Sequence, residues 1–446
     1  MQNALGVMPQ VLCEAIKRAS IGRGKDSAYS LIITTKVVED KNCCSIVCSN
    51  GNMQATSAFY AKLIRIENVD GKDTVVKEPL ENNIFIHAAP VLRDSVEALS
   101  EVDEKIMLVN EEKGLIAKNR RSIVPIPTLE ASVNIENPKG AKKIEIEVER
   151  SEIEDALKYV SATLSQAATS HFGSNYGLMP MMKDEKAVLH IAGCDEKSIS
   201  YKEIEATGLC DDFAEKCKDV TYAMVPTEKL SQIISTTAER VRFVFFYADD
   251  QVSVKQVNIK IGNDLYQILT SITQRYPQNI RSIVEEAYLT MDASFITPAK
   301  GLKNAFAITS LGKDASKVKS IMLVREGSIT ISNENGDQKT EIAVETQLAP
   351  GMKEVRISVV CSLMLSLLKP YNERIKIQGS HEDNGGLITF IGDDDSIRMA
   401  MFPVLTDKGK KALAERRKRE ASKKPDSDHG QAPETENQEE KEETEE

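Results

Sequence analysis

The side chains that could do chemistry in this sequence are few and scattered. Its histidines lie at positions 87, 171, 190, 381 and 429. The candidate cluster among them is His190 with Cys194 and Asp195. Alternation along a strand would put His190 and Cys194 on one face, but the cluster falls at a junction between a strand and a turn. We therefore predict neither a metal site nor a catalytic centre there.

The motifs of common enzymes are also missing. Gly22-Arg23-Gly24-Lys25 looks superficially like a phosphate loop, but it follows a helical pattern instead of opening one, so the helix N-terminus that would bind an anion is absent. Paired acids such as Asp249-Asp250 fall where hairpin turns are expected. The 8 cysteines form no CxxC pair and lie within apolar patterns, which favours reduced, buried thiols over disulfides or zinc. The sequence predicts a non-catalytic protein without cofactor or metal.

Length and composition indicate a soluble chain of several domains. The 446 residues exceed one ordinary core, and 41% hydrophobic with 28% charged residues is typical of globular proteins. No apolar run approaches the roughly 18–20 residues that span a bilayer. The first ten residues lack the basic and apolar regions of an export signal. We expect a cytoplasmic protein with no membrane partner.

The elements that would position any site form a unit that occurs three times, roughly 140 residues apart. Its clearest copy, Ser328 to Leu368, reads strand, turn, strand, turn, strand, helix; earlier copies begin at Ser45 and Leu189. Each unit reads helix, meander, helix, meander. First helices start near residues 9, 151 and 298, and second helices near 90, 226 and 359. The pattern predicts three tandem α+β domains at 1–140, 141–287 and 288–406.

Residues 407–446 form a charged tail that we expect to be disordered. Its part 408–424 carries nine basic and two acidic residues with the spacing of a short helix, and 425–446 is acidic without a large apolar residue. The basic block is either a solvated extension or a contact with nucleic acid or a partner. A net charge of −11 argues against nucleic acid, although an acidic body can still present a basic inner face.

The three units resemble the bacterial sliding clamp, the beta subunit of DNA polymerase III, over roughly residues 7–405. The resemblance is strongest at Val318 to Ser332, Glu341 to Leu368 and Met401-Phe402-Pro403-Val404, and Tyr276-Pro277 looks like the family's Phe-Pro-Asp segment. It implies an α+β fold of three DNA-clamp domains, each with two helices packed on antiparallel sheets. A dimer joined through first and third domains would close a six-domain ring.

The resemblance implies a processivity factor that encircles double-stranded DNA without reading its sequence. Such a ring tethers the replicative polymerase and other DNA enzymes, and takes the polymerase and the clamp loader through short peptide motifs. The alternative, from another class, is a clamp-fold scaffold protein that binds a partner without encircling DNA.

Three groups of site residues follow from the resemblance. The DNA-contacting residues would be Lys17, Arg18, Arg23, Lys25, Tyr176, Lys300, Lys303 and Lys313. The partner-peptide pocket would comprise Leu178, Gly193, Lys197, Pro277, Arg281, Ser358, Cys361, Phe402, Pro403, Val404 and Leu405. The dimer interface would use Phe306, Ile308 and Leu311.

The sequence departs from the family pattern within that pocket. The family's Thr-Asp-Gly-His/Tyr-Arg-Leu signature falls on Gly193–Ser198 and keeps only Lys197 in character. The closing Met-Pro-Met-Arg becomes Phe402-Pro403-Val404-Leu405, and the family's Asn and Tyr before the last helix become Ser358 and Cys361. These changes favour a divergent clamp that prefers a more apolar, less acidic peptide. The alternative is that 402–405 only fills the third domain.

Overall fold

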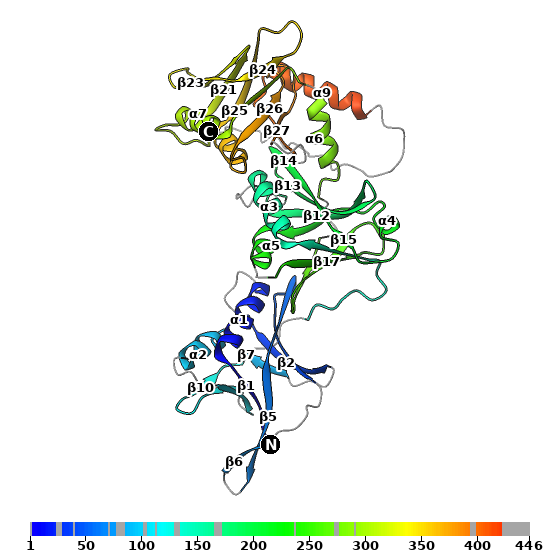
Figure 1. The fold of residues 1–446 in the computed structure, drawn as a ribbon, viewed down its shortest axis with the longest axis vertical. Coiled ribbons are helices and arrows are strands. Elements are labelled where there is room, and N and C mark those ends of the chain that lie inside the picture. The colour runs from blue at the N-terminus through cyan, green and yellow to red at the C-terminus, as the bar shows by residue number, and fades with distance from the viewer. Residues whose placement is uncertain are drawn as a thin grey trace, which may run out of the picture.

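Three α+β units follow one another along the long axis of the protein in a computed structural model (Figure 1). The structure describes residues 2–23, 29–38, 41–69, 72–76, 85–100, 105–111, 114–128, 134–164, 172–235, 238–271, 276–289, 291–392 and 398–421. Helices of all three units lie toward the left-hand side of Figure 1, which we call the helical side, and strands of all three units lie to their right, although some strands of the first and third units also lie on the left.

The first unit comprises β1 (Gln2–Val7), α1 (Pro9–Ala19), a 3-10 turn (Ser20–Gly22), β2 (Leu31–Val38), β3 (Lys41–Ser49), β4 (Met53–Phe59), β5 (Ala61–Val69), β6 (Lys72–Val76), β7 (Phe85–Ala88), α2 (Leu92–Leu99), β8 (Ile106–Glu111), β9 (Gly114–Lys118) and β10 (Ile123–Ile126).

The second unit comprises β11 (Lys143–Glu149), α3 (Arg150–Val160), a 3-10 turn (Ser161–Thr163), β12 (Asn175–Lys183), β13 (Lys186–Cys194), β14 (Ser198–Glu205), β15 (Thr207–Gly208), α4 (Phe213–Lys216), β16 (Ala223–Pro226), α5 (Thr227–Ile234), β17 (Arg240–Tyr247), β18 (Val254–Ile261) and β19 (Asp264–Leu269). Helix α6 (Ile280–Leu289) leads to the third unit.

The third unit comprises β20 (Ala293–Pro298), α7 (Ala299–Thr309), β21 (Lys319–Arg325), β22 (Ser328–Asn333), β23 (Lys339–Ala343), β24 (Glu345–Leu348), β25 (Glu354–Val360), α8 (Cys361–Leu367), β26 (Arg374–Gly379), β27 (Ile388–Ile391) and β28 (Arg398–Met401). Helix α9 (Asp407–Ala421) follows.

The first helices form where the sequence predicts them. Pro9 occupies the first turn of α1, where its missing N–H breaks no helical bond, and Leu12, Ala15 and Ile16 are buried at helical spacing. Each first helix ends on a serine whose Oγ donates to a carbonyl one turn back: Ser20 to Ile16, Ser161 to Lys158 and Ser310 to Ala307. The three helix ends are therefore equivalent positions.

Two nine-stranded sheets cross the boundaries between units. One has the order β15-β11-β17-β18-β19-β4-β3-β2-β7, and the other β16-β12-β13-β14-β28-β27-β26-β20-β24. The joining pairs, β19 with β4 and β14 with β28, are antiparallel. The remaining sheets have the orders β10-β9-β8-β1-β5-β6 and β23-β22-β21-β25. By position within the units, β10 corresponds to β19 and β28, and β23 corresponds to β4 and β14.

Two segments differ from the sequence-based expectation. The sequence analysis placed no helix at 280–289, although Ile280, Ile283 and Val284 have helical spacing and pack in a cluster beside β14. The expected disorder of the tail is wrong for Asp407–Ala421, which form α9 because this helix is capped and packs on the third unit. The expectation for 425–446 lies outside the described residues.

Candidate functional site

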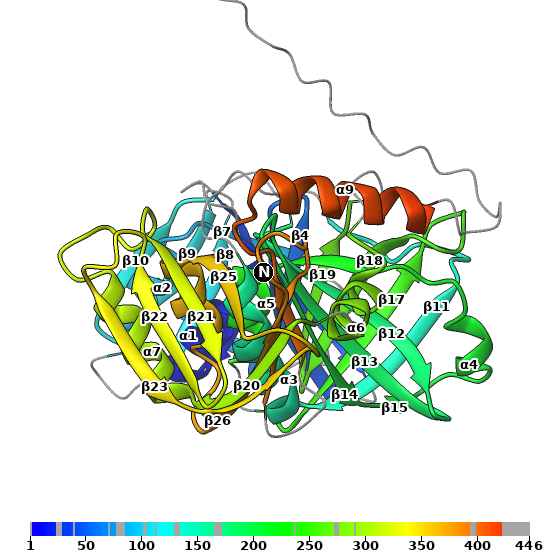
Figure 2. The ribbon, with the colours of Figure 1, turned by 90° about the horizontal axis from the view of Figure 1, so that it is seen from above.

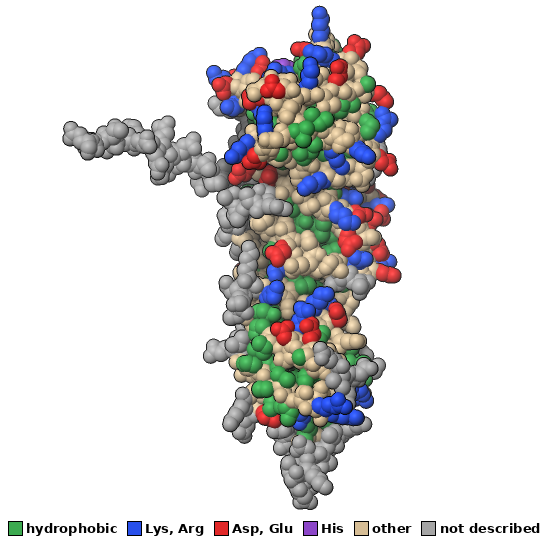
Figure 3. All heavy atoms as spheres, turned by 90° about the vertical axis from the view of Figure 1, so that its left-hand side faces the viewer, with side chains coloured by type: hydrophobic (Ala, Val, Ile, Leu, Met, Phe, Trp, Pro, Cys, Tyr) green, Lys and Arg blue, Asp and Glu red, His purple; other side chains and the backbone are tan. Residues whose placement is uncertain are grey.

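Exposed cations on the helical side are the candidates for contact with nucleic acid. Lys17 on α1, Lys300 on α7, Lys313 beyond α7 and Arg23 beyond α1 are exposed. Figure 3 views this side and shows acidic side chains interspersed with the basic ones. On α3, part of this acidity is locally paired, because Lys158 Nζ lies 3.1 Å from Asp155 and Arg150 pairs with Glu154. The helical side therefore carries both acidic and basic side chains, and its exposed cations are separated from one another.

Arg18 has a structural partner across the first boundary. Its Nε lies 2.8 Å from Asp264 Oδ2 and donates to Ser57 Oγ at 3.1 Å, while Ser57 Oγ donates to Asp264 Oδ1 at 2.6 Å. Asp264 is 8% exposed, and burial raises the pKa of its carboxyl although Ser57 and Arg18 oppose this. Arg18 therefore holds units one and two together, a role that the sequence analysis did not anticipate.

The side chains of two further residues predicted to contact DNA are bonded or buried within the protein. Lys303 Nζ donates to the Tyr371 carbonyl at 2.7 Å, beyond the end of α8. Tyr176 is only 3% exposed and packs in the main core, so the prediction that it contacts DNA is wrong: alternation along β12 turns its ring inward. Lys25 lies outside the described residues. Of the eight predicted residues, the structure leaves Lys17, Arg23, Lys300 and Lys313 exposed on or beside the first helices.

The segment 402–405 runs between the second and third units. Phe402 N donates to the Lys197 carbonyl at 2.9 Å, and Val404 N donates to the Ser358 carbonyl at 2.7 Å. Phe402, Val404 and Leu405 are half-buried, whereas Pro403 is buried. The segment thus links the turn after β13 to the end of β25, and brings together Lys197, Ser358 and 402–405, which the sequence analysis assigned to the peptide pocket.

Arg281 and Pro277 approach the same boundary from α6 and the residues before it. Pro277 is half-buried. Arg281 Nε lies 2.8 Å from Glu285 Oε1, and its Nη1 lies 3.6 Å from Glu203 Oε1 on β14. The hydrogen bond that Arg281 donates to Glu285 raises the pKa of Arg281, so this guanidinium is charged but already partnered.

Three predicted pocket residues face cores instead. Leu178 and Cys361 are 0% exposed; Leu178 packs in the main core, and Cys361 Sγ donates to the Phe306 carbonyl at 3.2 Å. At Gly193 a Cβ would lie 2.4 Å from the Val160 carbonyl oxygen, so this glycine faces the end of α3. Their assignment to the pocket is wrong, since strand alternation and helix packing turn them away from the surface.

An aromatic cluster occupies the outer face of β12 to β14 instead. Tyr276 is 1% exposed, and its ring covers Gly177, where a Cβ would meet it at 2.5 Å. Tyr276 Oη donates to the Ala192 carbonyl at 3.1 Å. The predicted boundary segment Tyr276-Pro277 therefore begins with a core residue.

The residues of the His190 cluster make packing and turn contacts. The ring of His190 stacks on Tyr201 with centroids 4.8 Å apart, and its Nδ1 lies 3.0 Å from Tyr222 Oη. Burial, with Arg281 and Lys183 nearby, lowers the pKa of His190 to about 3. Asp195 accepts hydrogen bonds from the backbone of Lys197 and Ser198, both at 2.7 Å, as a turn residue does. The three residues do not converge on a ligand.

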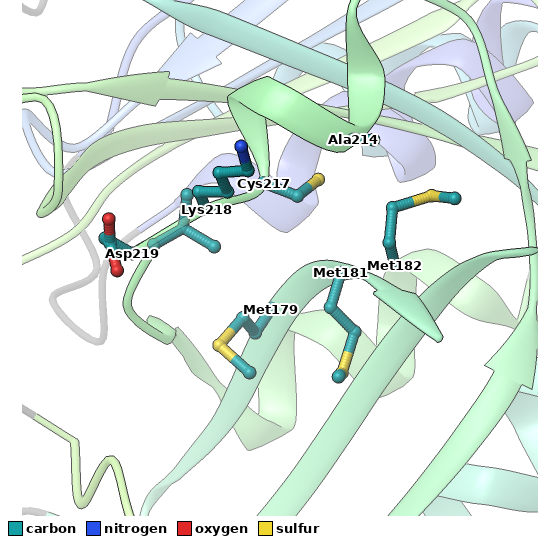
Figure 4. Close-up of a pocket in the computed structure, with 8 residues that line it drawn as sticks. Met179, Met181, Met182, Ala214, Cys217, Lys218 and Asp219 are labelled. Atoms are coloured by element: carbon teal, nitrogen blue, oxygen red, sulfur yellow. The ribbon is translucent and has the colours of Figure 1, made fainter. Parts of the chain in front are cut away.

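An apolar hollow that the sequence analysis missed lies between β12 and α4. It measures about 410 Å³, and the sulfur-bearing side chains of Met179, Met181, Met182 and Cys217 gather around it (Figure 4). Burial raises the pKa of the Cys217 thiol to about 12, so the thiol is protonated. Clustered methionines would have been the sequence signal, because methionine adapts to irregular apolar surfaces.

The predicted dimer residues divide into two groups. Phe306 is 0% exposed within the core, so its assignment to an interface is wrong: its side chain lies on the buried stripe of α7. Ile308 is 37% exposed and Leu311 is 62% exposed. Ile123 on β10 is 69% exposed and was not anticipated, although its place in a short strand after two arginines is visible in the sequence.

Comparisons with known proteins agree with this architecture. A curated relative, the beta sliding clamp of Helicobacter pylori, is 22% identical over 188 residues, which is 42% of this chain and 46% of that protein; the match thus spans less than half of the relative. A beta sliding clamp structure from Caulobacter crescentus matches with a TM-score of 0.69 and 13% identity, covering 91% of this chain and 100% of that one.

Two further DNA polymerase III beta subunit structures agree. The Pseudomonas aeruginosa protein has a TM-score of 0.67 with 13% identity over 90% of this chain, and the Thermotoga maritima protein 0.66 with 13% over 91%; both are covered completely. No protein-family model matches the chain. The predicted α+β clamp fold and the resemblance to bacterial sliding clamps are confirmed. Within the described residues, no helix is both long and apolar enough to cross a bilayer.

Proposed function

We propose that two copies of this chain join head to tail into a closed ring of six units that encircles double-stranded DNA as a sliding clamp. The supporting observation is that, among the described residues of the first and third units, one strand of each has no further strand beside it, although the corresponding strands at the two internal boundaries pair with the next unit. β4 pairs with β19 and β14 with β28, while the corresponding strands β23 and β10 end their sheets in the described part of the chain. Pairing β23 with the second copy's β10, twice about a two-fold axis, would close the ring.

We infer the register of that contact from the equivalent positions in the repeats. In each unit one residue closes the hairpin turn because its carbonyl accepts the N–H of the residue that begins the turn. These equivalent residues are Met53, Ser198 and Gln338, which accept from Asn50, Asp195 and Asn333, respectively. Met53 lies opposite Ile268, and Ser198 opposite Met401.

The positions on the other strand of each contact are Ile268, Met401 and Ile126. They are equivalent because each lies opposite the corresponding residue of the preceding strand in its unit, which is Val257, Ile388 and Leu115, respectively. We therefore expect Gln338 to lie opposite Ile126 of the partner subunit.

The exposed apolar residues at the end of α7 support the same contact. Counted from the terminal serines, Ile308 is equivalent to Arg18 and Tyr159. At the two internal boundaries those positions reach the next unit: Arg18 contacts Asp264, and Tyr159 Oη lies 2.6 Å from Tyr371 Oη. Ile308 is 37% exposed within the single chain, so we propose that the partner covers it, with Ile123 of the partner subunit as the apolar counterpart.

The DNA would pass along the helical side and be held by topology more than by affinity. Lys17, Arg23, Lys300 and Lys313 can approach phosphates without reading bases, which suits a ring that slides. No chemical step is assigned to the protein, and the proposed role is non-catalytic. Action on chromosomal DNA would place it in the cytoplasm.

Partner proteins, a DNA polymerase and a clamp loader, would bind by short peptides beside Lys197, Pro277, Arg281 and the segment 402–405. The half-buried side chains Phe402, Val404 and Leu405 offer an apolar surface for such a peptide. Val404→Asp should abolish binding of the polymerase's clamp-binding peptide while the melting temperature stays unchanged. Unchanged affinity in a normally folded variant would place the partner site elsewhere.

A monomeric scaffold protein is the second candidate function, because Pro125 offers no N–H to the free edge of β10 and so weakens strand addition there. Light scattering at tens of micromolar separates the two. The ring requires a particle of twice the 49.3 kDa chain mass, whereas a particle of 49.3 kDa at this concentration would refute it in favour of the scaffold.

A further inference from the structure

Helix α9 and the acidic end of the chain carry opposite charges. Residues 407–424 contain nine basic and three acidic residues, whereas residues 425–446 contain one lysine and ten acidic residues. In the view down the long axis, α9 lies along one side of the molecule, outside the sheets (Figure 2). We propose that the acidic segment 425–446 docks on α9 of its own chain and shields that helix from other polyanions.

α9 is fixed to the third unit by its first two turns. Thr406 Oγ1 accepts the N–H of Gly409 at 3.1 Å, as an N-cap does. The helix approaches the loop after β26 so closely that a Cβ at Gly409 would lie 2.1 Å from the Glu382 carbonyl oxygen. Gly385 faces Gly409 and Leu413 from that loop, with Leu413 N 2.8 Å from where its Cβ would be. These backbone contacts hold the helix through small residues and do not involve the side chains of Lys408, Lys410 and Lys411.

The cations of these turns are available to a further partner. Lys408, Lys410 and Lys411 are all exposed. Lys408 Nζ is 3.7 Å from the half-buried Asp383, and Lys410 Nζ is 3.2 Å from the exposed Asp407. Ion pairs of such exposed lysines are worth little in water. Lys411 has no ion pair with the residues that the structure describes. A segment rich in carboxylates could therefore gain several new pairs here at small cost.

The acidic segment is long enough to reach back along the helix. The 15 residues of α9 span about 22 Å. Pro425, Gly430 and Pro433 supply residue types that reverse the chain. The last 13 residues, 434–446, carry eight of the ten acids and can extend over about 43 Å, more than the length of the helix.

The nature of the contact follows from composition. Residues 425–446 contain no large apolar side chain, so docking must be electrostatic and screened by salt. Tethering compensates for weak pairing, because a short connection in the same chain holds the segment at an effective concentration on the order of millimolar.

The test is a competition for a polyanion probe, heparin, at low salt. The full chain is compared with a chain that ends at Lys424 and with a full-length chain in which the acids of 425–446 are replaced by amides. Both altered chains should bind heparin about tenfold more tightly than the full chain, and this difference should vanish at high salt. Equal affinity of all three chains would overturn the proposal.

A second background separates docking on α9 from a general effect of net charge. In a Lys408→Gln, Lys410→Gln, Lys411→Gln chain, removing 425–446 should give a clearly smaller gain in heparin affinity than in the unaltered background. If truncation raises affinity as much as before, the segment acts by its charge alone, and docking on α9 is refuted.

Zero-length carbodiimide cross-linking of the intact chain then identifies the pairs. Cross-links between the lysines of α9 and the glutamates of 434–446 within one chain are expected. Cross-links found only between isotopically distinct chains would show docking on a second copy and would overturn the intramolecular proposal.

Discussion

The two internal boundaries of this molecule share a backbone arrangement but use different side-chain chemistry. At the first, buried polar groups meet: Gln54 Nε2 donates to Gln267 Oε1 at 2.8 Å, next to the ion pair of Arg18 with Asp264. At the second, Tyr159 and Tyr371 join their hydroxyls, and Ile199 lies opposite Ala400 in the strand pair. Strand pairing and helix ends therefore define a boundary, and its side chains can be polar or apolar.

The same freedom appears where the end of a first helix approaches the neighbouring strands. In the first unit Gly22 faces the Cys48 carbonyl, and in the second Gly193 faces the Val160 carbonyl, with would-be Cβ distances of 2.3 and 2.4 Å. Counted from the hairpin turns and the terminal serines, Gly193 is equivalent to Cys48, and Gly22 to Thr163. The close approach between the helix end and the strand is therefore present in both units, but the glycine that allows it lies at the helix end in the first unit and on the strand in the second.

The largest expected effect concerns the third boundary, which we propose forms between two chains with apolar chemistry. Ile308→Asp would bury an unpaired carboxylate at both contacts of the ring, at about 3 kcal/mol each, and lower the dimer affinity more than about a thousandfold. Sedimentation velocity across a dilution series measures this. Val11→Asp is the matched control, since Val11 is also 37% exposed but lies away from the proposed contact; a variant at Ile308 that stays dimeric would disprove the assignment.

The next effect tests the exchanged glycines. Gly193→Val and Gly22→Val should each destabilise the fold by about 3 kcal/mol, because the new side chain collides with backbone that cannot move aside. Urea unfolding monitored by circular dichroism gives the change. Gly301→Val, with open space around the helix surface, should change stability by less than about 1 kcal/mol. Equal effects at positions 193 and 301 would show that the close approach is not required.

The repeat was predictable from sequence because helix-opening prolines and alternating strands depend on local pattern. The six helices expected from it are present at the expected places. Which cations remain free could not be predicted: Arg18 and Lys17 are neighbours on α1, and only the approach of Asp264 from another unit distinguishes them. Leu178 and Tyr176 were misassigned for a related reason, since a register error of one residue moves a strand side chain to the other face.

Acid should act oppositely on the two boundaries. His190, stacked on the boundary strand β14, is neutral when folded, with its pKa lowered from 6.5 to about 3. The unfolded chain takes up a proton near pH 6.5, so stability falls as pH drops, by about 2 kcal/mol between pH 6.5 and 4.5. At the first boundary the raised pKa of Asp264 means that the fold binds its proton more tightly, which favours the folded state as acid is added.

His190→Phe keeps an aromatic ring against Tyr201 and should remove most of this loss on acidification. Thermal melts from pH 7 to 4.5 measure the slope. Tyr222→Phe, which removes only the hydroxyl facing His190 Nδ1, should keep the slope, and a slope that survives in His190→Phe would assign the acid sensitivity to other groups.

The smallest expected effects separate the neighbours Lys17 and Arg18 at the first boundary. Arg18→Gln removes the cation that faces the buried carboxylate of Asp264, so it should cost about 1–2 kcal/mol of stability and leave DNA binding unchanged. Lys17→Gln removes only an exposed charge, so stability should change by less than about 0.5 kcal/mol. Because the proposed ring carries two copies, that variant should lower the slope of log affinity against log salt by up to about 2 on duplex DNA. Fluorescence anisotropy across a salt series gives the slopes. A reduced slope in Arg18→Gln with none in Lys17→Gln would mean that the ion pair at the boundary opens on DNA and that Arg18, not Lys17, faces the phosphates.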